Sequence, residues 1–147
     1  MKETINISDL MVQNHKYIKR LFNVFKKNLK GNNGRVLESF DIFKWEMEKH
    51  LLIEEKAIFG FYYSDDSEDY EITLDLIKQH KVILEMLKII EMDLKNDGVA
   101  NILEFERLWV KHKRFEDEIF YPELDRKLNN YEKKNIAERI VYSIPVN

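Results

Sequence analysis

The chain has 147 residues, of which 44% are hydrophobic and 35% are charged, and its formal net charge is −3. This length predicts a single domain over residues 1–147, and the hydrophobic fraction is sufficient for a core. The absence of cysteine excludes disulfides, thiolate metal sites and cysteine nucleophiles. No apolar run is long enough to cross a membrane, and the near-neutral charge balance argues against a nucleic-acid binder. The first residues lack the apolar stretch of a signal peptide, so we expect a cytoplasmic location.

Clusters of helix-breaking residues divide the chain into long segments, at residues 31–34, 64–67 and 96–98. The segments between them predict helices over residues 9–29, 35–63, 68–95 and 99–128. Ser8 and Ser67 are the expected N-caps of the first and third helices. Pro122 predicts a kink or an early end in the fourth. A fifth, short helix over residues 131–142 is expected to cap the bundle, with a role in dimerisation as the alternative.

Hydrophobic residues recur at spacings of three and four in each long segment. In the first segment the positions are Met11, His15, Ile18, Phe22, Phe25 and Leu29, and the fourth has Ile102, Phe105, Trp109, His112, Glu116 and Ile119. This alternation is typical of the buried face of a helix in a bundle. Four such helices with short connections predict an all-α, up-down-up-down four-helix bundle over about residues 8–128, followed by a helical tail at 129–147.

Six polar residues stand at buried-face positions: His15, His50, Glu54, His80, His112 and Glu116. The chain has four histidines, and one falls on each predicted helix. Each glutamate follows a histidine by four residues, which places the pair on one face of its helix. The sequence after the two HxxxE motifs is also similar, so residues 50–60 and 112–122 form a weak internal repeat.

Such a polar cluster in a core is difficult to explain without a metal. An unpaired buried carboxylate is costly, and two facing carboxylates repel one another. Imidazole and carboxylate ligands suit iron, manganese or zinc, and two cations would satisfy both glutamates. Two alternatives remain at this stage, namely hydrogen-bonded core histidines and buried His–Glu ion pairs. Glu46, four residues before His50, is a candidate additional ligand or a solvated neighbour of the site.

The helical pattern with His15, the motif His50-xxx-Glu54, His80 and the motif His112-xxx-Glu116 resembles the hemerythrin-like, or HHE cation-binding, family over about residues 8–128. The resemblance implies a non-haem di-iron centre with two iron ions and an oxo or hydroxo bridge. By this resemblance His15 and His50 would bind one iron, His80 and His112 would bind the other, and Glu54 and Glu116 would bridge them.

Two positions differ from the oxygen-carrying hemerythrins. Leu84 stands where those proteins have a further histidine, and Glu116 replaces an aspartate that lies five residues after the fourth-helix histidine. Both differences favour the broader HHE group, whose members are linked to oxygen, nitric oxide or iron sensing and to iron–sulfur cluster repair. We therefore expect a protein that binds or senses a small gaseous ligand, dioxygen or nitric oxide. The alternatives are a redox enzyme that reduces nitric oxide or peroxide or repairs iron–sulfur clusters, and an iron-storage or buffering module.

Overall fold

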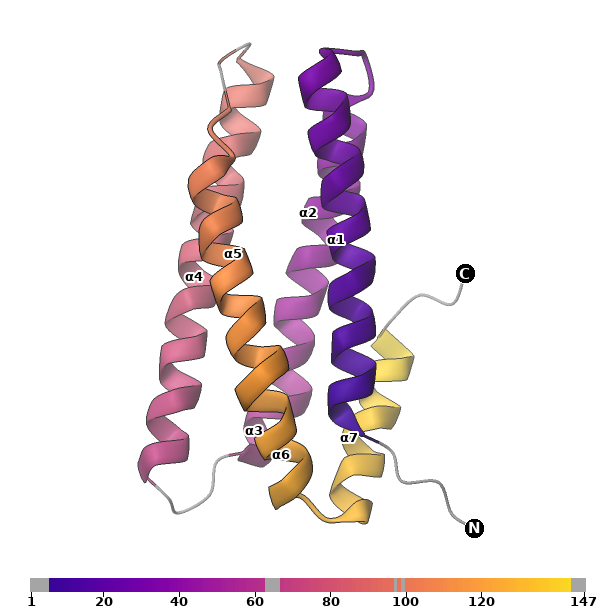
Figure 1. The fold of residues 1–147 in the computed structure, drawn as a ribbon, viewed down its shortest axis with the longest axis vertical. Coiled ribbons are helices and arrows are strands. Elements are labelled where there is room, and N and C mark those ends of the chain that lie inside the picture. The colour runs from indigo at the N-terminus through magenta and orange to yellow at the C-terminus, as the bar shows by residue number, and fades with distance from the viewer. Residues whose placement is uncertain (1–5, 63–66, 97, 99, 144–147) are drawn as a thin grey trace.

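The computed structural model describes residues 6–62, 67–96, 98 and 100–143, and every regular element in these ranges is a helix. The elements are α1 (Ile7–Gly31), α2 (Val36–Ile53), η1 (Glu54–Ile58), α3 (Phe59–Tyr62), α4 (Ser67–Lys95), α5 (Leu103–Phe115), η2 (Glu116–Phe120), α6 (Tyr121–Lys127) and α7 (Asn130–Ser143). The π-helical turns η1 and η2 continue α2 into α3 and α5 into α6. Four long helical rods therefore run side by side (Figure 1), and the predicted all-α bundle is confirmed.

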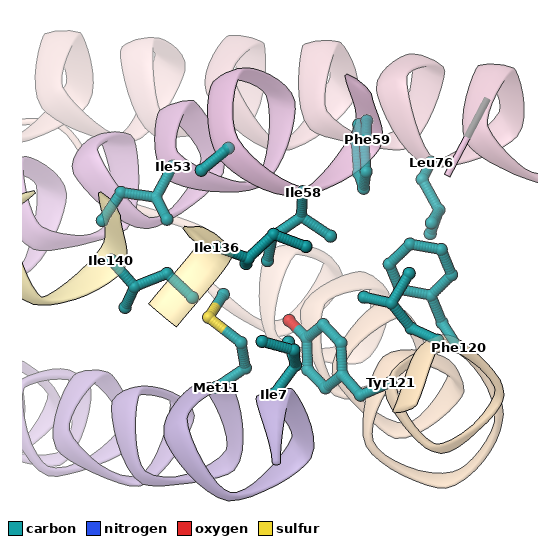
Figure 2. Packing of buried hydrophobic residues seen from close by; sticks show 12 residues of the cluster. Ile7, Met11, Ile53, Ile58, Phe59, Leu76, Phe120, Tyr121, Ile136 and Ile140 are labelled. Carbon is teal, nitrogen blue, oxygen red and sulfur yellow. The ribbon is translucent and has the colours of Figure 1, made fainter. Parts of the chain in front are cut away.

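In the described part of the chain, the core consists of two hydrophobic clusters. One is rich in aromatic rings and includes Phe22, Phe25, Phe40, Phe43, Phe105 and Trp109. The other, shown in Figure 2, joins the start of α1 to η1, α6 and α7 and includes Ile7, Met11, Ile58, Phe120, Tyr121, Leu124, Ile136 and Ile140. On α1 the predicted ligand His15 lies between Met11 of the second cluster and Ile18 of the first. The polar residues therefore lie between two apolar clusters.

The first turn of α1 is capped by a residue of α6, which is distant in the sequence but lies at the same end of the bundle. The helix begins at Ile7 with Asn6 as N-cap, and the predicted cap Ser8 lies inside the helix. The Asp125 carboxylate accepts the backbone N–H of Ile7 at 2.7 Å and of Ser8 at 3.0 Å. A carboxylate at this position satisfies two free amide groups and interacts favourably with the helix dipole. The Ser8 prediction was wrong because a tertiary contact replaces the local cap.

The fourth helical rod differs from the prediction at two points. It begins at Leu103 rather than at residue 99, and the Asn101 side chain accepts the Leu103 amide at 3.2 Å. It continues through η2 and α6 to Lys127, which agrees with the predicted end at residue 128, and Pro122 does not end it early. Ile119, predicted to be buried, is 56% exposed, while Phe120 and Tyr121 are buried. The reason is the π-helical turn, in which Tyr121 donates its backbone N–H to Glu116 five residues back and the buried face shifts by one residue.

The C-terminal helix α7 packs against α1, α2 and η1, and Ile136 and Ile140 are fully buried in the second cluster. It lies against the side of the bundle near the end at which α1 begins (Figure 1), so it extends the core of that end from the side rather than closing it from below as the sequence suggested. The expected cap Ser67 begins α4, but its side chain lies outside what the structure describes. Within the described residues, none of the helices combines the length and the hydropathy needed to span a bilayer.

Candidate metal centre

All six polar residues singled out in the sequence meet in the middle of the bundle, and none is more than 2% exposed. Their ligand atoms form two groups, one from His15, His50, Glu54 and Glu116 and the other from Glu54, His80, His112 and Glu116. Within each group the four ligand atoms lie within 4.8 Å of one another. Glu54 and Glu116 belong to both groups, so the geometry provides two adjoining four-ligand sites with two shared carboxylates.

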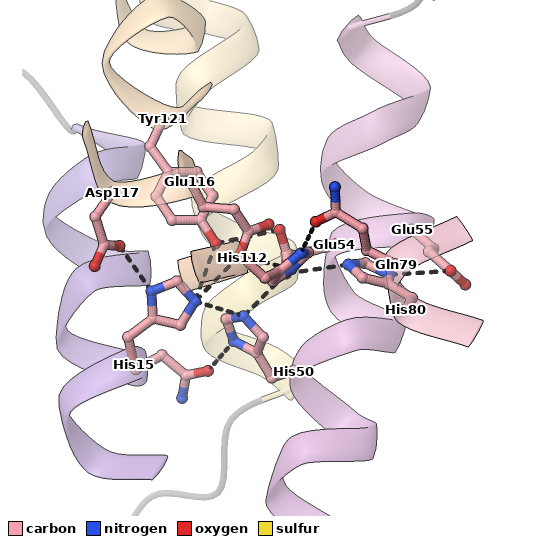
Figure 3. A network of polar contacts seen from close by, with 11 residues as sticks. His15, His50, Glu54, Glu55, Gln79, His80, His112, Glu116, Asp117 and Tyr121 are labelled. Carbon is pink, nitrogen blue, oxygen red and sulfur yellow. Dashed lines mark hydrogen bonds and ion pairs between the residues drawn. The ribbon is translucent and has the colours of Figure 1, made fainter. Parts of the chain in front are cut away.

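The inner nitrogen of each imidazole faces the carboxylates. His50 Nε2 lies 2.9 Å from Glu54 Oε1, and His80 Nε2 lies 3.7 Å from the same oxygen. His15 Nε2 and His112 Nε2 lie 3.3 Å and 3.2 Å from Glu116 Oε1. Figure 3 shows the four rings arranged around the two glutamates. Each glutamate therefore contacts one imidazole from each group.

The outer nitrogen of each imidazole has its own hydrogen-bond acceptor. The Nδ1 atoms of His15 and His80 face carboxylate oxygens, Asp117 at 2.7 Å and Glu55 at 3.1 Å. The Nδ1 atoms of His50 and His112 face amide oxygens, Asn14 at 2.5 Å and Gln79 at 2.6 Å. Because these oxygens only accept hydrogen bonds, we assign the proton to Nδ1 in all four rings. The Nε2 lone pairs then point into the site, as metal-binding histidines require.

The two halves of the chain supply equivalent parts of this network. Asn14 directly precedes His15, and Gln79 directly precedes His80. Glu55 directly follows Glu54, and Asp117 directly follows Glu116. The contact between His15 and Asp117 in one half corresponds to that between His80 and Glu55 in the other. The contact between His50 and Asn14 likewise corresponds to that between His112 and Gln79. The weak repeat seen in the sequence therefore corresponds to a pseudo-twofold arrangement of the site.

Several buried polar atoms at the centre have no hydrogen-bond partner in the described part of the chain. They are Glu54 Oε1, His80 Nε2, His112 Nε2 and both carboxylate oxygens of Glu116. An unsatisfied buried polar atom costs free energy comparable to a lost hydrogen bond or more. Lone pairs of nitrogen and oxygen that converge without donors fit a cation, so the residues present suit a metal.

Electrostatics in the absence of a cation points the same way. Burial is the main reason that the pKa of His15 is lowered and that the pKa of His112 falls to about 3, so these rings stay neutral. Burial and the nearby Glu54 carboxylate raise the pKa of Glu116 well above its usual value. Burial also opposes ionisation of Glu54, but the interactions of this carboxyl with Glu116 and His50 outweigh burial and lower the pKa of Glu54. The two facing carboxyl groups therefore do not both ionise readily in this buried site, a conflict that a bound cation removes.

An aromatic ring lies against one histidine of each group. The Tyr121 hydroxyl donates to Glu54 Oε2 at 3.2 Å and lies 3.5 Å from His15 Nε2. The Phe59 ring stacks on His80 with its centroid 5.6 Å away. Tyr121 is fully buried, and burial together with Glu116 and Glu54 raises the pKa of its hydroxyl well above 10.0. Tyr121 therefore stays protonated and offers one O–H donor to the centre.

Two other residues considered in the sequence lie outside both ligand groups. Glu46 is not solvated, because only 5% of it is exposed, and its carboxylate pairs with Lys49 Nζ at 3.0 Å. Leu84 is half-buried and lines a surface groove between α2 and α4 beside Trp45 and Leu51. Glu46 thus has a cation partner of its own, and Leu84 contributes an apolar wall on the His80 side of the bundle.

The sequence reasoning missed five residues of this network: Asn14, Glu55, Gln79, Asp117 and Tyr121. The first four follow from adjacency, since each lies next to a predicted ligand and carries a side-chain oxygen. Their repetition in both halves of the chain was the available signal. Tyr121 could not be found in this way, because a regular α-helix would turn a residue five positions after Glu116 away from the site.

The fold and the site define a helical bundle whose buried His/Glu cluster is suited to binding metal cations. The family model described as hemerythrin HHE cation-binding domain matches residues 6–124, and the chain belongs to this family. The match covers all six predicted ligands and confirms the resemblance noted in the sequence. No curated protein and no solved structure gives a significant match to the chain.

Proposed function

We propose that this chain is a non-haem di-iron protein that binds or senses dioxygen or nitric oxide. His15 and His50 hold one iron, His80 and His112 hold the other, and Glu54 and Glu116 bridge the pair. The observation that carries this proposal is the sharing of both carboxylates by two groups of converging ligand atoms. Iron supplies reversible redox chemistry and gas binding to such a site, while manganese or zinc fits the same donors.

The number of protein ligands supports gas binding. Each ion would receive two imidazole nitrogens and two carboxylate oxygens, which leaves room for an exogenous ligand on a six-coordinate ion. The surrounding side chains are the two apolar clusters, which exclude water and favour a small neutral gas over a hydrated ion. Tyr121 adds one hydrogen-bond donor at the edge of this apolar space.

A redox enzyme built on the same centre is the second candidate. The buried Tyr121 hydroxyl favours it, because this donor lies within 3.5 Å of both Glu54 and His15 and could move a proton at the glutamate oxygen. Nitric oxide and peroxide are the oxidants that fit this candidate. Iron–sulfur repair and metal storage are further alternative functions that rest on the sequence argument alone. A cytoplasmic location and a single domain over residues 1–147 also stay predictions from the sequence.

The deciding experiment is metal analysis and absorption spectroscopy of protein expressed with added iron. We expect about two iron ions per chain and a spectrum that changes reversibly when dioxygen or nitric oxide is added to the reduced protein. Less than one ion per chain would overturn the di-iron proposal. A full iron complement with turnover of nitric oxide or peroxide would favour the enzyme, and iron that is silent to gases would favour storage.

A further inference from the structure

The surface between α1 and α5 carries a concentration of positive charge that the net charge of the chain hides. One hollow on this surface is lined by Lys19, Lys26, Arg107, Lys111 and Arg114. A second, adjoining hollow adds Lys16, Arg20 and Lys113. These eight cationic residues share the two hollows with only two acidic residues, whereas the whole chain has a formal net charge of −3. The remainder of the protein is therefore strongly acidic, and the α1/α5 face is its basic side.

The two acidic residues of this face are already engaged within the protein. Glu106 forms an ion pair with Lys26 at 2.6 Å, and Asp117 accepts the Nδ1 proton of His15 at 2.7 Å. Among the described residues, no carboxylate lies within ion-pair distance of Arg107, Lys111 or Arg114. Like charges gathered without counter-charges repel one another, so this arrangement lowers the stability of the free protein and favours an anionic partner.

The basic face leads to the candidate metal centre. The second hollow is lined by His15 and Asp117 in addition to its lysines and arginine. His15 is one of the inward-facing imidazoles, and its outer nitrogen is bound to Asp117. Of the four inward-facing histidines, His15 is the one that lines either of these basic hollows. A partner seated on α1 and α5 would therefore lie next to the outer edge of one ligand ring.

We propose that the α1/α5 face is the docking surface for an acidic electron-carrier protein, which delivers electrons to the centre beside His15. This inference rests on the proposed function, because a metal centre that binds dioxygen or nitric oxide works from its reduced form and must be re-reduced whenever it oxidises. In each encounter one electron leaves the reduced cofactor of the carrier, and the centre gains it. The basic side chains hold the acidic carrier for the time that this transfer needs.

The extent of the face favours a protein over a small anion. On α1 the basic residues run from Lys16 to Lys26, a length of about 15 Å at the helical rise. They are spread along two helices rather than converging on one point, and most are exposed. Weak redox encounters use small surfaces of this kind, with charge complementarity setting the association rate. The strongly acidic remainder of the chain disfavours a nucleic acid, which would contact a larger surface.

The test measures binding of an acidic [2Fe–2S] ferredoxin to the full chain by calorimetry at low and high ionic strength. The variant carries Arg107→Glu, Lys111→Glu and Arg114→Glu. The matched control carries Lys81→Glu, Lys88→Glu and Lys134→Glu, three exposed cationic residues on α4 and α7 with the same change of net charge. Binding is measured on metal-free protein as well, so a failure of the di-iron proposal does not affect this readout.

We expect the α1/α5 variant to lose at least about tenfold in affinity and the control about twofold or less, with wild-type binding weakened by salt. In iron-loaded protein, reduction by the ferredoxin should slow in the same variant while its iron content stays unchanged. Absence of ferredoxin binding to the wild type, or equal losses in the two variants, would overturn the proposal. Duplex DNA that binds more tightly than the ferredoxin and with the same sensitivity to the variant would also overturn it.

Discussion

Phe59 and Tyr121 occupy equivalent positions in the two halves of the site, each five residues after a central glutamate and at the end of a π-helical turn. Phe59 donates its backbone N–H to Glu54, as Tyr121 does to Glu116. Each ring lies against the first histidine of one group, Phe59 on His80 and Tyr121 on His15. The pair differs by a single hydroxyl, so the two halves of a nearly symmetric centre are chemically unequal.

This difference predicts that Tyr121→Phe alters the binding of exogenous ligands more than the content of metal. We expect the Tyr121 hydroxyl to turn from Glu54 to a bound anion such as azide. Loss of that hydrogen bond costs about 1.5 kcal/mol, which is about a tenfold loss of azide affinity. Titration of azide into iron-loaded protein, followed by absorption, measures this. Phe59→Tyr is the matched variant and should leave the azide affinity within about threefold of the wild type. If Tyr121→Phe binds azide as the wild type does, the hydroxyl serves only as a donor to Glu54.

The shared carboxylates predict an order of sensitivity among ligand variants. Glu54→Ala and Glu116→Ala should each lose most of both metal ions, because each glutamate belongs to both ligand groups. His15→Ala should retain more metal, because His15 belongs to one group. Metal analysis after dialysis measures the difference, with circular dichroism to verify folding. Equal retention in all three variants would contradict the bridging roles.

The side-chain oxygens that accept the Nδ1 protons of the histidines predict an effect on metal affinity that depends on the acceptor. Gln79→Leu removes the oxygen that accepts the His112 Nδ1 proton, and we expect metal to bind about 10 to 100 times more weakly. Gln79→Glu should restore most of the affinity, because a carboxylate serves this role for His80 and His15. Competition with a chromophoric chelator measures the affinity. Leucine has a volume similar to that of glutamine but lacks an acceptor oxygen, so a loss in Gln79→Leu that Gln79→Glu reverses reflects the lost acceptor rather than packing.

Removal of the metal should destabilise the protein without unfolding it. Metal binds the folded site and finds no preformed site in the unfolded chain, which contributes about 2.7 kcal/mol when the free metal is at a hundred times its Kd. The helices should persist, because the two hydrophobic clusters contain no metal ligand. Calorimetry of matched metal-loaded and metal-free samples should show a lower Tm for the latter with a similar helical circular dichroism spectrum. Equal Tm values would make the metal incidental to the fold.

The pH dependence of the metal-free protein follows from His112. Its pKa is about 3 in the folded protein against 6.5 for the free side chain, so the unfolded chain binds the proton more tightly. The stability that neutral His112 contributes is therefore complete above pH 6.5 and is lost as the pH falls toward 3. Urea unfolding of wild type and His112→Gln across this range isolates the effect. We expect the wild type to lose stability relative to the variant on acidification, and a constant difference would contradict the buried, neutral ring.

The sequence was sufficient to predict the bundle and the six converging side chains because both depend on local periodicity. A histidine or glutamate at a buried-face position of a helix must face its neighbours, and short connections leave few other arrangements. Prediction of the ligands required a correct helical phase only as far as Glu54 and Glu116. The two π-helical turns begin at these glutamates, so they do not disturb the phase before them. The phase was wrong only beyond these residues, as Ile119 shows.

The features that could not be predicted depend on tertiary contacts. The cap on α1 comes from Asp125, which lies 118 residues from Ile7, and local rules have no means to select it. The start of α5 depends on how Asn101 orients its side chain toward the Leu103 amide. Tyr121 reaches the site only because a π-helical turn replaces an α-helical one. In each case several local conformations have similar energies, and tertiary contacts in the folded protein select one of them.

The hydrogen bond between Ile7 and Asp125 also affects the order in which parts of the protein fold. Because its two residues are 118 positions apart, it forms only after nearly the whole bundle has been synthesised. Closing so long a segment carries a large entropy cost, which favours earlier formation of the contacts between neighbouring helices. We therefore expect the part of the second hydrophobic cluster that joins Ile7 to Tyr121 and Ile136 to close last. We expect a metal ion to reach the histidines and glutamates beside it during this interval, before the contacts between α1 and α6 close this end of the bundle.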